Sequence, residues 1–256
     1  MTGKHRLPFL FAAFFVSFAL ICFPSQGVIH IKAHLGDLKN ENSTGGFKID
    51  AVTGNCDISA RGGGIEIGII EGNLIAKTSR GDVIVNEVTG NARLFTGGGN
   101  IAVQRVRNTV KAETLLGDIS IYSAENVVIE NSYGGDVNLF NVSGYAKVTT
   151  VGNILLRTDA KSNRTDICDL SSAIGDVVIE IPKMTDALLE VITPITKDPR
   201  RDTQIKSDFS FTNFKQGMID EGAKLKIKAQ INNGGRKIKI YIAKGNIYLK
   251  IINKEK

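Results

Sequence analysis

The chain has 256 residues, a formal net charge of +6 and no tryptophan, and 42% of its residues are hydrophobic. This ordinary apolar fraction, with 27 glycines and only 5 prolines, describes a folded, turn-rich chain and excludes a disordered one. The length suits one sizeable domain, or a domain with a cap.

The chain begins like a secreted protein. After a positively charged start, residues 7–23 are almost wholly apolar, and Ser25 and Gly27 are small residues suited to cleavage. We therefore predict that residues 1–27 are a signal peptide and that the mature chain is exported to the periplasm, the cell surface or the medium. Two alternatives stay open: an uncleaved anchor, because the apolar run approaches membrane-spanning length, and a lipoprotein attached through Cys22.

A nine-residue glycine period follows. Asn108 and Asn126 occupy two vacant places in a series that runs Gly36, Gly45, Gly54, Gly63, Gly72, Gly81, Gly90, Gly99, Gly117, Gly135 and Gly144. Glycine and asparagine tolerate left-handed backbone better than other residues. The period therefore predicts a left-handed corner at each ninth residue.

Two further columns have a period of eighteen. One is Val52, Ile70, Val88, Val106, Ala124 and Val142, and the other is Thr78, Thr96, Thr114, Ser132 and Thr150. Between the corners, apolar residues alternate as they do in strands with one buried face. Residues 28–182 are therefore predicted to form an all-β, single-stranded parallel β-solenoid, or β-helix, of 18-residue coils with two nine-residue arms. The register slips at 125–130 and after Val151, where we expect bulges.

The last third is less regular. A polar loop is predicted at 157–172 and a strand at 175–181, ended by Pro182. Residues 183–256 are predicted to be a C-terminal β segment that continues or caps the solenoid. Its expected elements are a strand at 187–192, a loop at 194–207 and closing strands at 224–231, 237–243 and 247–252. Phe209 and Phe211 point to one side, either to cover an open sheet end or to form a hydrophobic binding strip.

Charge is distributed unevenly along the mature chain. Residues 28–182 hold 14 Lys and Arg against 18 Asp and Glu, whereas residues 183–256 hold 16 against 8. The basic end suits an anionic envelope polymer, although alternating lysines also make the ordinary solvated face of strands. Nucleic acid is not predicted as a partner, because no basic surface interleaved with aromatic residues is evident.

Two cysteines remain in the mature chain. Cys56 and Cys168 are separated by about six coils, which places them on the order of 29 Å apart at the spacing of parallel strands. A disulfide requires Cα atoms within about 7 Å, so none is predicted even though export would permit one. Cys56 is expected to be a small core residue.

No catalytic, cofactor-binding or metal-binding residues are predicted. His30 and His34 share one side of a strand but lack further ligands for zinc. Acidic residues follow only some of the corner glycines, as at Asp37, Asp82, Asp118 and Asp136, so they are interpreted as turn residues that bond their own backbone and not as calcium ligands. The threonine column is interpreted as stacked, mutually hydrogen-bonded side chains and not as a flat binding array.

Six segments carry a family resemblance. They are residues 88–94, 114–121, 142–148, 175–182, 231–240 and 244–249. In this order they resemble the bacterial adhesin-like family of β-strand-repeat, β-solenoid proteins of unknown function, apart from the charged stretch at 183–207. The resemblance implies a non-enzymatic module of the cell envelope that acts in interaction or as a scaffold, with an envelope protein or glycan as its partner.

Two other functions stay open. A polysaccharide-processing β-helix enzyme would require acidic and basic residues that converge, for which the candidates are Arg61, Arg80, Asp82 and Arg105. An envelope sensing or regulatory protein would require only a binding face. The sequence leaves the oligomeric state open.

Overall fold

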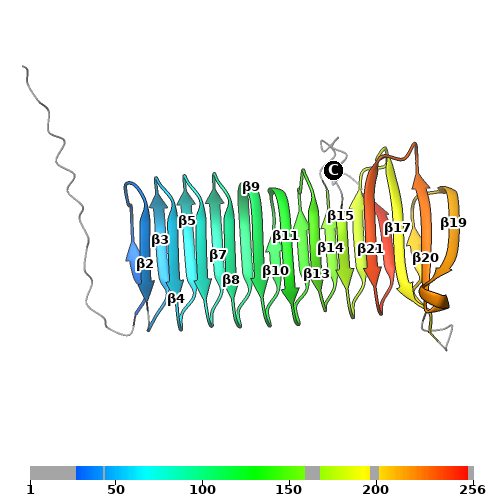
Figure 1. Cartoon of the computed structure of the whole chain (residues 1–256). Coiled ribbons are helices and arrows are strands. Elements are labelled where there is room, and N and C mark those ends of the chain that lie inside the picture. Colours follow the sequence, from blue (N-terminus) through cyan, green and yellow to red (C-terminus); the bar gives the residue numbers. More distant parts are fainter. Residues whose placement is uncertain (1–26, 43, 159–167, 197–201, 253–256) are drawn as a thin grey trace, which may run out of the picture.

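The computed structural model describes residues 27–42, 44–158, 168–196 and 202–252, so residues 1–26 of the predicted leader lie outside the described residues. The chain is all-β: a parallel β-solenoid of about seven turns of about 18 residues, followed by a less regular part. The coils follow one another along a single axis from β2 to β19 (Figure 1). The predicted fold class is confirmed.

Each coil contributes strands to two parallel stacks. The first stack contains β1 (Ile29–Ile31), β3 (Phe47–Val52), β5 (Ile65–Ile70), β7 (Val83–Val88), the start of β9 (Ile101–Thr114), β10 (Ile119–Ile121), β12 (Val137–Phe140), β14 (Ile154–Arg157) and β16 (Val177–Ile181). The second contains β2 (Leu38–Asn42), β4 (Cys56–Ala60), β6 (Leu74–Thr78), β8 (Ala92–Thr96), the end of β9, β11 (Ala124–Ser132), β13 (Ala146–Thr150) and β15 (Cys168–Ser172).

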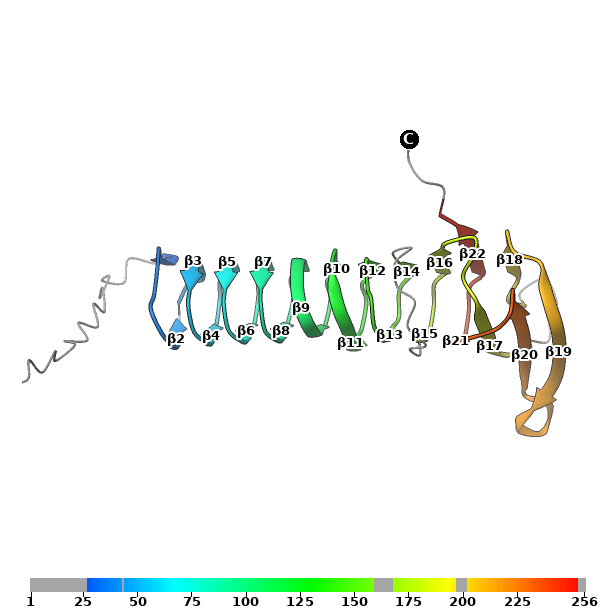
Figure 2. The same cartoon turned by 90° about the horizontal axis from the view of Figure 1, so that it is seen from above.

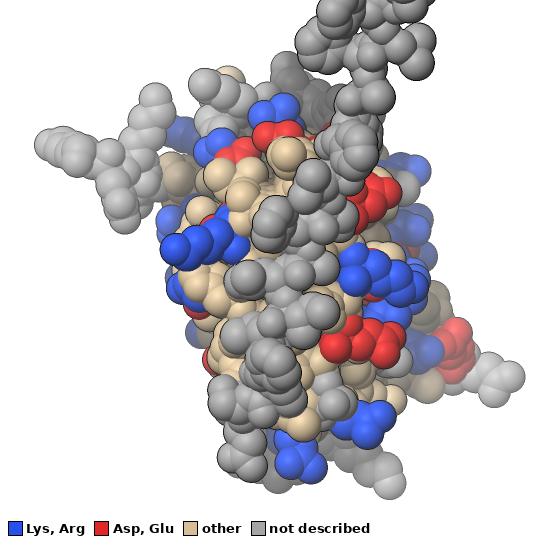
Figure 3. Space-filling model, turned by 90° about the vertical axis from the view of Figure 1, so that its left-hand side faces the viewer, with Lys and Arg blue, Asp and Glu red and all other residues tan. Residues whose placement is uncertain are grey.

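The core lies between the stacks, because every second side chain of a strand points inward. Val52, Ile70, Val88, Val106, Ala124 and Val142 are all buried and pair in register from coil to coil, which confirms the predicted apolar column. Seen from the N-terminal end of the axis, charged side chains of both signs lie around the sides of the solenoid (Figure 3). This arrangement follows from strands whose outer face is polar.

The corner glycines are needed for a different reason from the one predicted. Only Gly36 and Gly81 of the period-nine series have positive φ, and Asn108 and Asn126 lie inside β9 and β11. A Cβ atom on Gly72 or Gly90 would instead lie 2.6 Å from the carbonyl oxygen of the glycine one coil earlier. Close stacking of successive corners, not left-handed backbone, therefore excludes a side chain there.

The threonine column is aligned as predicted, but its hydrogen bonds differ. Thr78, Thr96, Thr114 and Thr150 are buried, and each donates its hydroxyl to a corner carbonyl fifteen residues earlier, as Thr96 does to Gly81 at 2.8 Å. They do not bond one another. The column therefore satisfies carbonyls that the corners bring into the core, and none of these four side chains forms an exposed array.

Asn and Asp side chains form a second type of corner ladder. The side-chain oxygen of Asp82 accepts from the backbone N–H of Asn100 at 2.8 Å, and the pattern continues through Asp118, Asp136, Asn153 and Asp176. The prediction that these residues bond their own turn was wrong, because they bond the next coil. These hydrogen bonds connect successive coils at the corners, where the hydrogen bonds between strands are interrupted.

The predicted slips of register are present. Against its neighbours, β11 shifts register between Ala124 and Asn126 and again between Ile129 and Ser132. The second slip is taken up differently: β12 pairs with β14 at an offset of seventeen residues and without a bulge, so the corner around Gly152 absorbs the missing residue. The loop predicted at 157–172 was wrong at its end, where β15 continues the second stack; residues 159–167 lie outside the described part.

The C-terminal segment does not simply continue the solenoid. β17 (Ala187–Pro194) and β18 (Ile205–Ser207) come next in sequence, but β21 (Arg236–Ile242) pairs with both β15 and β17, and β22 (Ile247–Ile251) with both β16 and β18. The last coil of the sequence is thus inserted between two coils that precede it (Figure 2). The backbone N–H of Asn246 bonds Asp176 at 2.8 Å and its side chain accepts from Gln204, so the corner ladder also passes through the inserted coil.

An antiparallel pair ends the second stack. β20 (Lys224–Ile231) pairs with β17, and β19 (Phe211–Ile219) pairs with β20; a short 3-10 turn, η2 (Asp220–Gly222), connects them. Phe209 is buried in the core. Phe211 is half-buried and packs against the core. Both phenylalanines therefore pack on the core and do not form an exposed hydrophobic strip.

Cys56 and Cys168 are buried and form no disulfide, as predicted, and they lie in one interior column with six pairings between them. Burial, with a smaller contribution from the charge of Asp57, raises the pKa of Cys56 to about 12.

We expect no reaction of Cys56 with a thiol reagent at pH 8 until the protein unfolds. The exposed variant Lys77→Cys should react at once. Labelling of native Cys56 as fast as that control would contradict the buried position.

Candidate binding groove

A shallow groove runs along the outer surface of the first stack. It has a volume of about 310 Å³, crosses β3, β5, β7 and β9, and ends at Tyr122 directly after β10, a length of about 19 Å at the spacing of neighbouring strands. It is hollow because two outward positions carry almost no side chain: Gly68 and Ala102. A Cβ atom on Gly68 would also overlap the carbonyl oxygen of Asp50, so backbone packing keeps this gap open.

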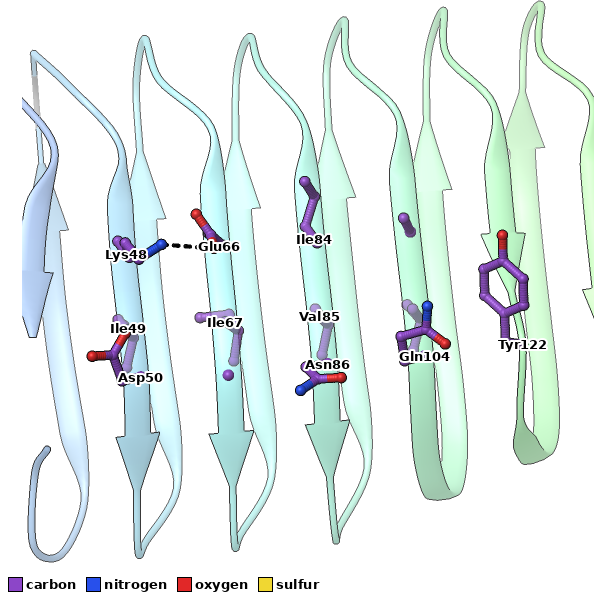
Figure 4. A pocket seen from close by; sticks show the side chains of 13 residues that line it. Lys48, Ile49, Asp50, Glu66, Ile67, Ile84, Val85, Asn86, Gln104 and Tyr122 are labelled. Carbon is purple, nitrogen blue, oxygen red and sulfur yellow. Dashed lines mark hydrogen bonds and ion pairs between the residues drawn. The ribbon is translucent and has the colours of Figure 1, made fainter. Parts of the chain in front are cut away.

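Polar side chains form one row along the groove. Asp50, Asn86, Gln104 and Tyr122 point outward from successive coils, with Gly68 between the first two (Figure 4). We call these four side chains the outer row. Within the part of the chain that the structure describes, the amides of Asn86 and Gln104 bond no other group, so their donors and acceptors are available to a ligand.

Tyr122 closes one end of the groove as a fixed aromatic platform. Its ring stacks on Phe140 with centroids 5.3 Å apart and an interplanar angle of 15°. The Arg157 guanidinium lies 5.9 Å from the Phe140 centroid and pairs with Glu180. The tyrosine is still 44% exposed, so part of its side chain stays accessible at this end of the groove.

Ion pairs hold the other end. Lys48 donates to Glu66 at 2.9 Å across neighbouring coils, and this hydrogen bond, followed by the charge of Glu66, raises the pKa of Lys48. Nε2 of His30 lies 3.1 Å from both carboxylate oxygens of Asp50. Because these pairs are exposed, they contribute little to stability and mainly keep the side chains along the edge of the groove.

The residues considered for chemistry from sequence come together only in part. His34 contacts the carbonyl oxygen of Asp37 at 3.0 Å, away from the carboxylate that His30 faces. Asp82 precedes β7 and belongs to the corner ladder, whereas Arg105 pairs in register with Glu87 near the other end of the strand. Arg61 and Arg80 lie at the corners that follow β4 and β6. Arg80 and Asp82 therefore share the corner between β6 and β7, and Arg61 lies at the equivalent corner one coil earlier. Among the described residues no ion pair joins these three side chains, and Arg105 lies at the other end of the strand.

The outer row was missed from sequence, although a signal for it existed. Its members recur near the eighteen-residue spacing, at 50, 68, 86, 104 and 122. Written in rows of eighteen, the chain places two amides, an aromatic residue and a glycine in a single outward column. Sequence alone does not show that the neighbouring Ala102 deepens this column into a groove.

Within the described ranges, no group of three or more His, Cys, Asp and Glu side chains is arranged to hold a metal ion. The described part likewise contains no helix that is long and apolar enough to cross a membrane. Comparisons with protein families, curated proteins and solved structures found no match to this chain. The resemblance of its repeats to an adhesin-like family therefore stays a prediction.

Proposed function

We propose that this protein is an exported, non-enzymatic module of the cell envelope, adhesin-like in role, which binds an extended glycan along its outer groove. The observation that carries the proposal is the outer row: two unpartnered amides and a platform tyrosine on one straight line at coil spacing. Sugar hydroxyls need donors and acceptors in the plane of the ring, and sugar C–H faces pack on aromatic rings.

The geometry of the solenoid supports a polymer over a small molecule. The groove is open along its length, and its outer row presents a polar side chain from each coil except that of Gly68, with coils about 4.8 Å apart. The rings of an extended β-linked glycan repeat at a comparable interval, so one chain can contact several coils at once. Stacked coils also preorganise the row, which lowers the entropic cost of binding.

Binding of oligosaccharides tests the proposal. We expect β-linked N-acetylglucosamine oligomers to bind more tightly as their length grows from two to six rings, because more of the row is contacted. Asn86→Ala with Gln104→Ala removes two sets of hydrogen bonds and should weaken binding about tenfold or more. Calorimetric titration measures both effects.

Tyr122→Ala should weaken binding by a comparable factor, because it removes the platform. The matched control is Tyr145→Ala, which deletes a similarly exposed tyrosine outside the groove. If the oligomers bind the Tyr122 and Tyr145 variants equally well, the groove is not the glycan site.

A further inference from the structure

A second and larger hollow lies on the outer surface of the second stack, near the C-terminal end. Its volume is about 720 Å³, and four strands line it: β17, β19, β20 and β21. Four lysines surround it, two from β21 and one each from β19 and β20: Lys237, Lys239, Lys215 and Lys228. The inserted coil is what brings β21 beside β17, so this surface exists only because of the unusual order of the coils.

Most of the positive charge around this hollow has no counter-charge inside it. Glu190 is the one acid in its lining, and it already pairs with Lys226 at 3.0 Å and Lys228 at 3.9 Å. Lys215, Lys237 and Lys239 form no ion pair within the described residues. The nearest further acid in register is Asp169, which lies opposite Lys239 on the neighbouring strand β15.

The wall opposite β21 is shaped by an irregular strand. β19 shifts register between Thr212 and Lys215, and Asn213 adopts φ of 49°. The Asn213 amide donates to Gln230 at 2.7 Å, and Gln230 donates to the carbonyl of Asn232 at 3.0 Å. Bulges re-aim neighbouring side chains, and this amide chain holds the bulge beside Lys215 in one position.

The spacing of the lysines favours a chain of anions over a single ion. Lys237 and Lys239 are two residues apart on one strand, which is about 7 Å, and Lys239 and Lys228 are two strands apart, about 10 Å. These spacings join backbone positions, and they spread the ammonium groups of the four lysines over the three strands β19, β20 and β21. The ammonium groups match successive charges along a flexible polymer, and lysine binds phosphate as a point charge.

We propose that this lysine-lined hollow binds a linear polyanion through its phosphate groups, at a site separate from the groove of the first stack. The ligand class is a soluble or wall-attached polymer with one phosphate per repeat. Binding there would fix the C-terminal end of the solenoid to an anionic envelope polymer and leave the outer row exposed for its own ligand.

Inorganic polyphosphate of one defined length is the probe. We expect the full chain to bind it with an affinity that falls as salt is raised, because the lysines are exposed. Lys215→Gln with Lys237→Gln and Lys239→Gln should weaken binding about tenfold or more. The control Lys32→Gln with Lys77→Gln and Lys244→Gln makes the same change of net charge elsewhere on the surface and should bind like the unmodified protein.

Three results would overturn the proposal. Equal weakening by both triple variants would show that net charge alone drives binding. Orthophosphate binding as tight as polyphosphate would show a single-ion site. Binding to vesicles of anionic phospholipid, without binding to polyphosphate, would assign the surface to a membrane. None of these results affects glycan binding in the other groove, so the two proposals fail independently.

Discussion

A chain that ends at Gly235 should lose its folded C-terminal part, although it keeps β17 to β20. Such a chain lacks the inserted coil. Strands β15 and β17 then lose their common partner β21, and β16 and β18 lose their common partner β22. Buried side chains on both sides, such as Leu170 and Leu189, would then contact water. In contrast, the coils before β15 should persist, because each coil of a solenoid contacts only its neighbours.

Limited proteolysis with circular dichroism measures this outcome. We expect early cleavage within 187–231 and a stable N-terminal fragment, whereas the full chain resists digestion.

A substitution in the full-length chain tests the same position. Ile240→Asp buries a charge in the inserted coil and should lower the free energy of unfolding by about 4 kcal/mol or more. Its control is Lys237→Asp on the exposed side of the same strand, where the partner in register on β17 is Leu188 and not an acid. An unfolding midpoint for Ile240→Asp equal to that of the control would contradict the position of β21.

Gly99→Ala should destabilise the solenoid strongly, whereas Gly98→Ala should not. A Cβ atom on Gly99 would overlap the carbonyl oxygen of Gly81, which is backbone and cannot rotate away. Nothing lies within 4 Å of a Cβ atom on Gly98. Overpacking of this kind costs about 1–3 kcal/mol or more. The open position should be neutral or stabilised by about 0.4–1 kcal/mol through the unfolded state.

Thermal or denaturant unfolding measures the stability of the two variants. The comparison shows whether glycine is needed at a corner to avoid a steric clash or to allow a left-handed backbone. Neither Gly98 nor Gly99 has positive φ. If a left-handed backbone were the only reason for glycine at a corner, alanine would therefore be tolerated at both positions. Equal stability of the two variants would therefore contradict the close-stacking explanation. The amide of Gly99 also donates to Thr96 at 3.1 Å, so the strained variant should disturb the buried threonine column as well.

The repeat itself was predictable because its signals agree. A period of nine, two columns of period eighteen and alternating apolar residues all demand the same stacked strands. The cause of the glycine period was not predictable from sequence. A left-handed backbone and a close backbone contact both favour a residue without Cβ, so both lead to glycine. Partners of Thr96 and Asp82 were missed for a related reason: they lie in the neighbouring coil, fifteen or eighteen residues away.

The order of the last coils was beyond the sequence pattern. β21 alternates Ile238, Ile240 and Ile242 inward as any strand of this solenoid would, and nothing in that pattern states which neighbours it joins. Pairing with both β15 and β17 is a property of the whole chain. The lysine-lined hollow depends on that order, so the sequence predicted a basic C-terminal segment but not its shape.

The most direct test of the central claim is to observe the two free amides while a glycan is added. In NMR spectra of the labelled protein, the side-chain NH₂ signals of Asn86 and Gln104 should shift during titration with a β-linked N-acetylglucosamine hexasaccharide, and the Gln230 signal on the other stack should not move. Saturating amounts of the hexasaccharide that leave both groove amides unshifted would contradict a glycan site in the outer groove.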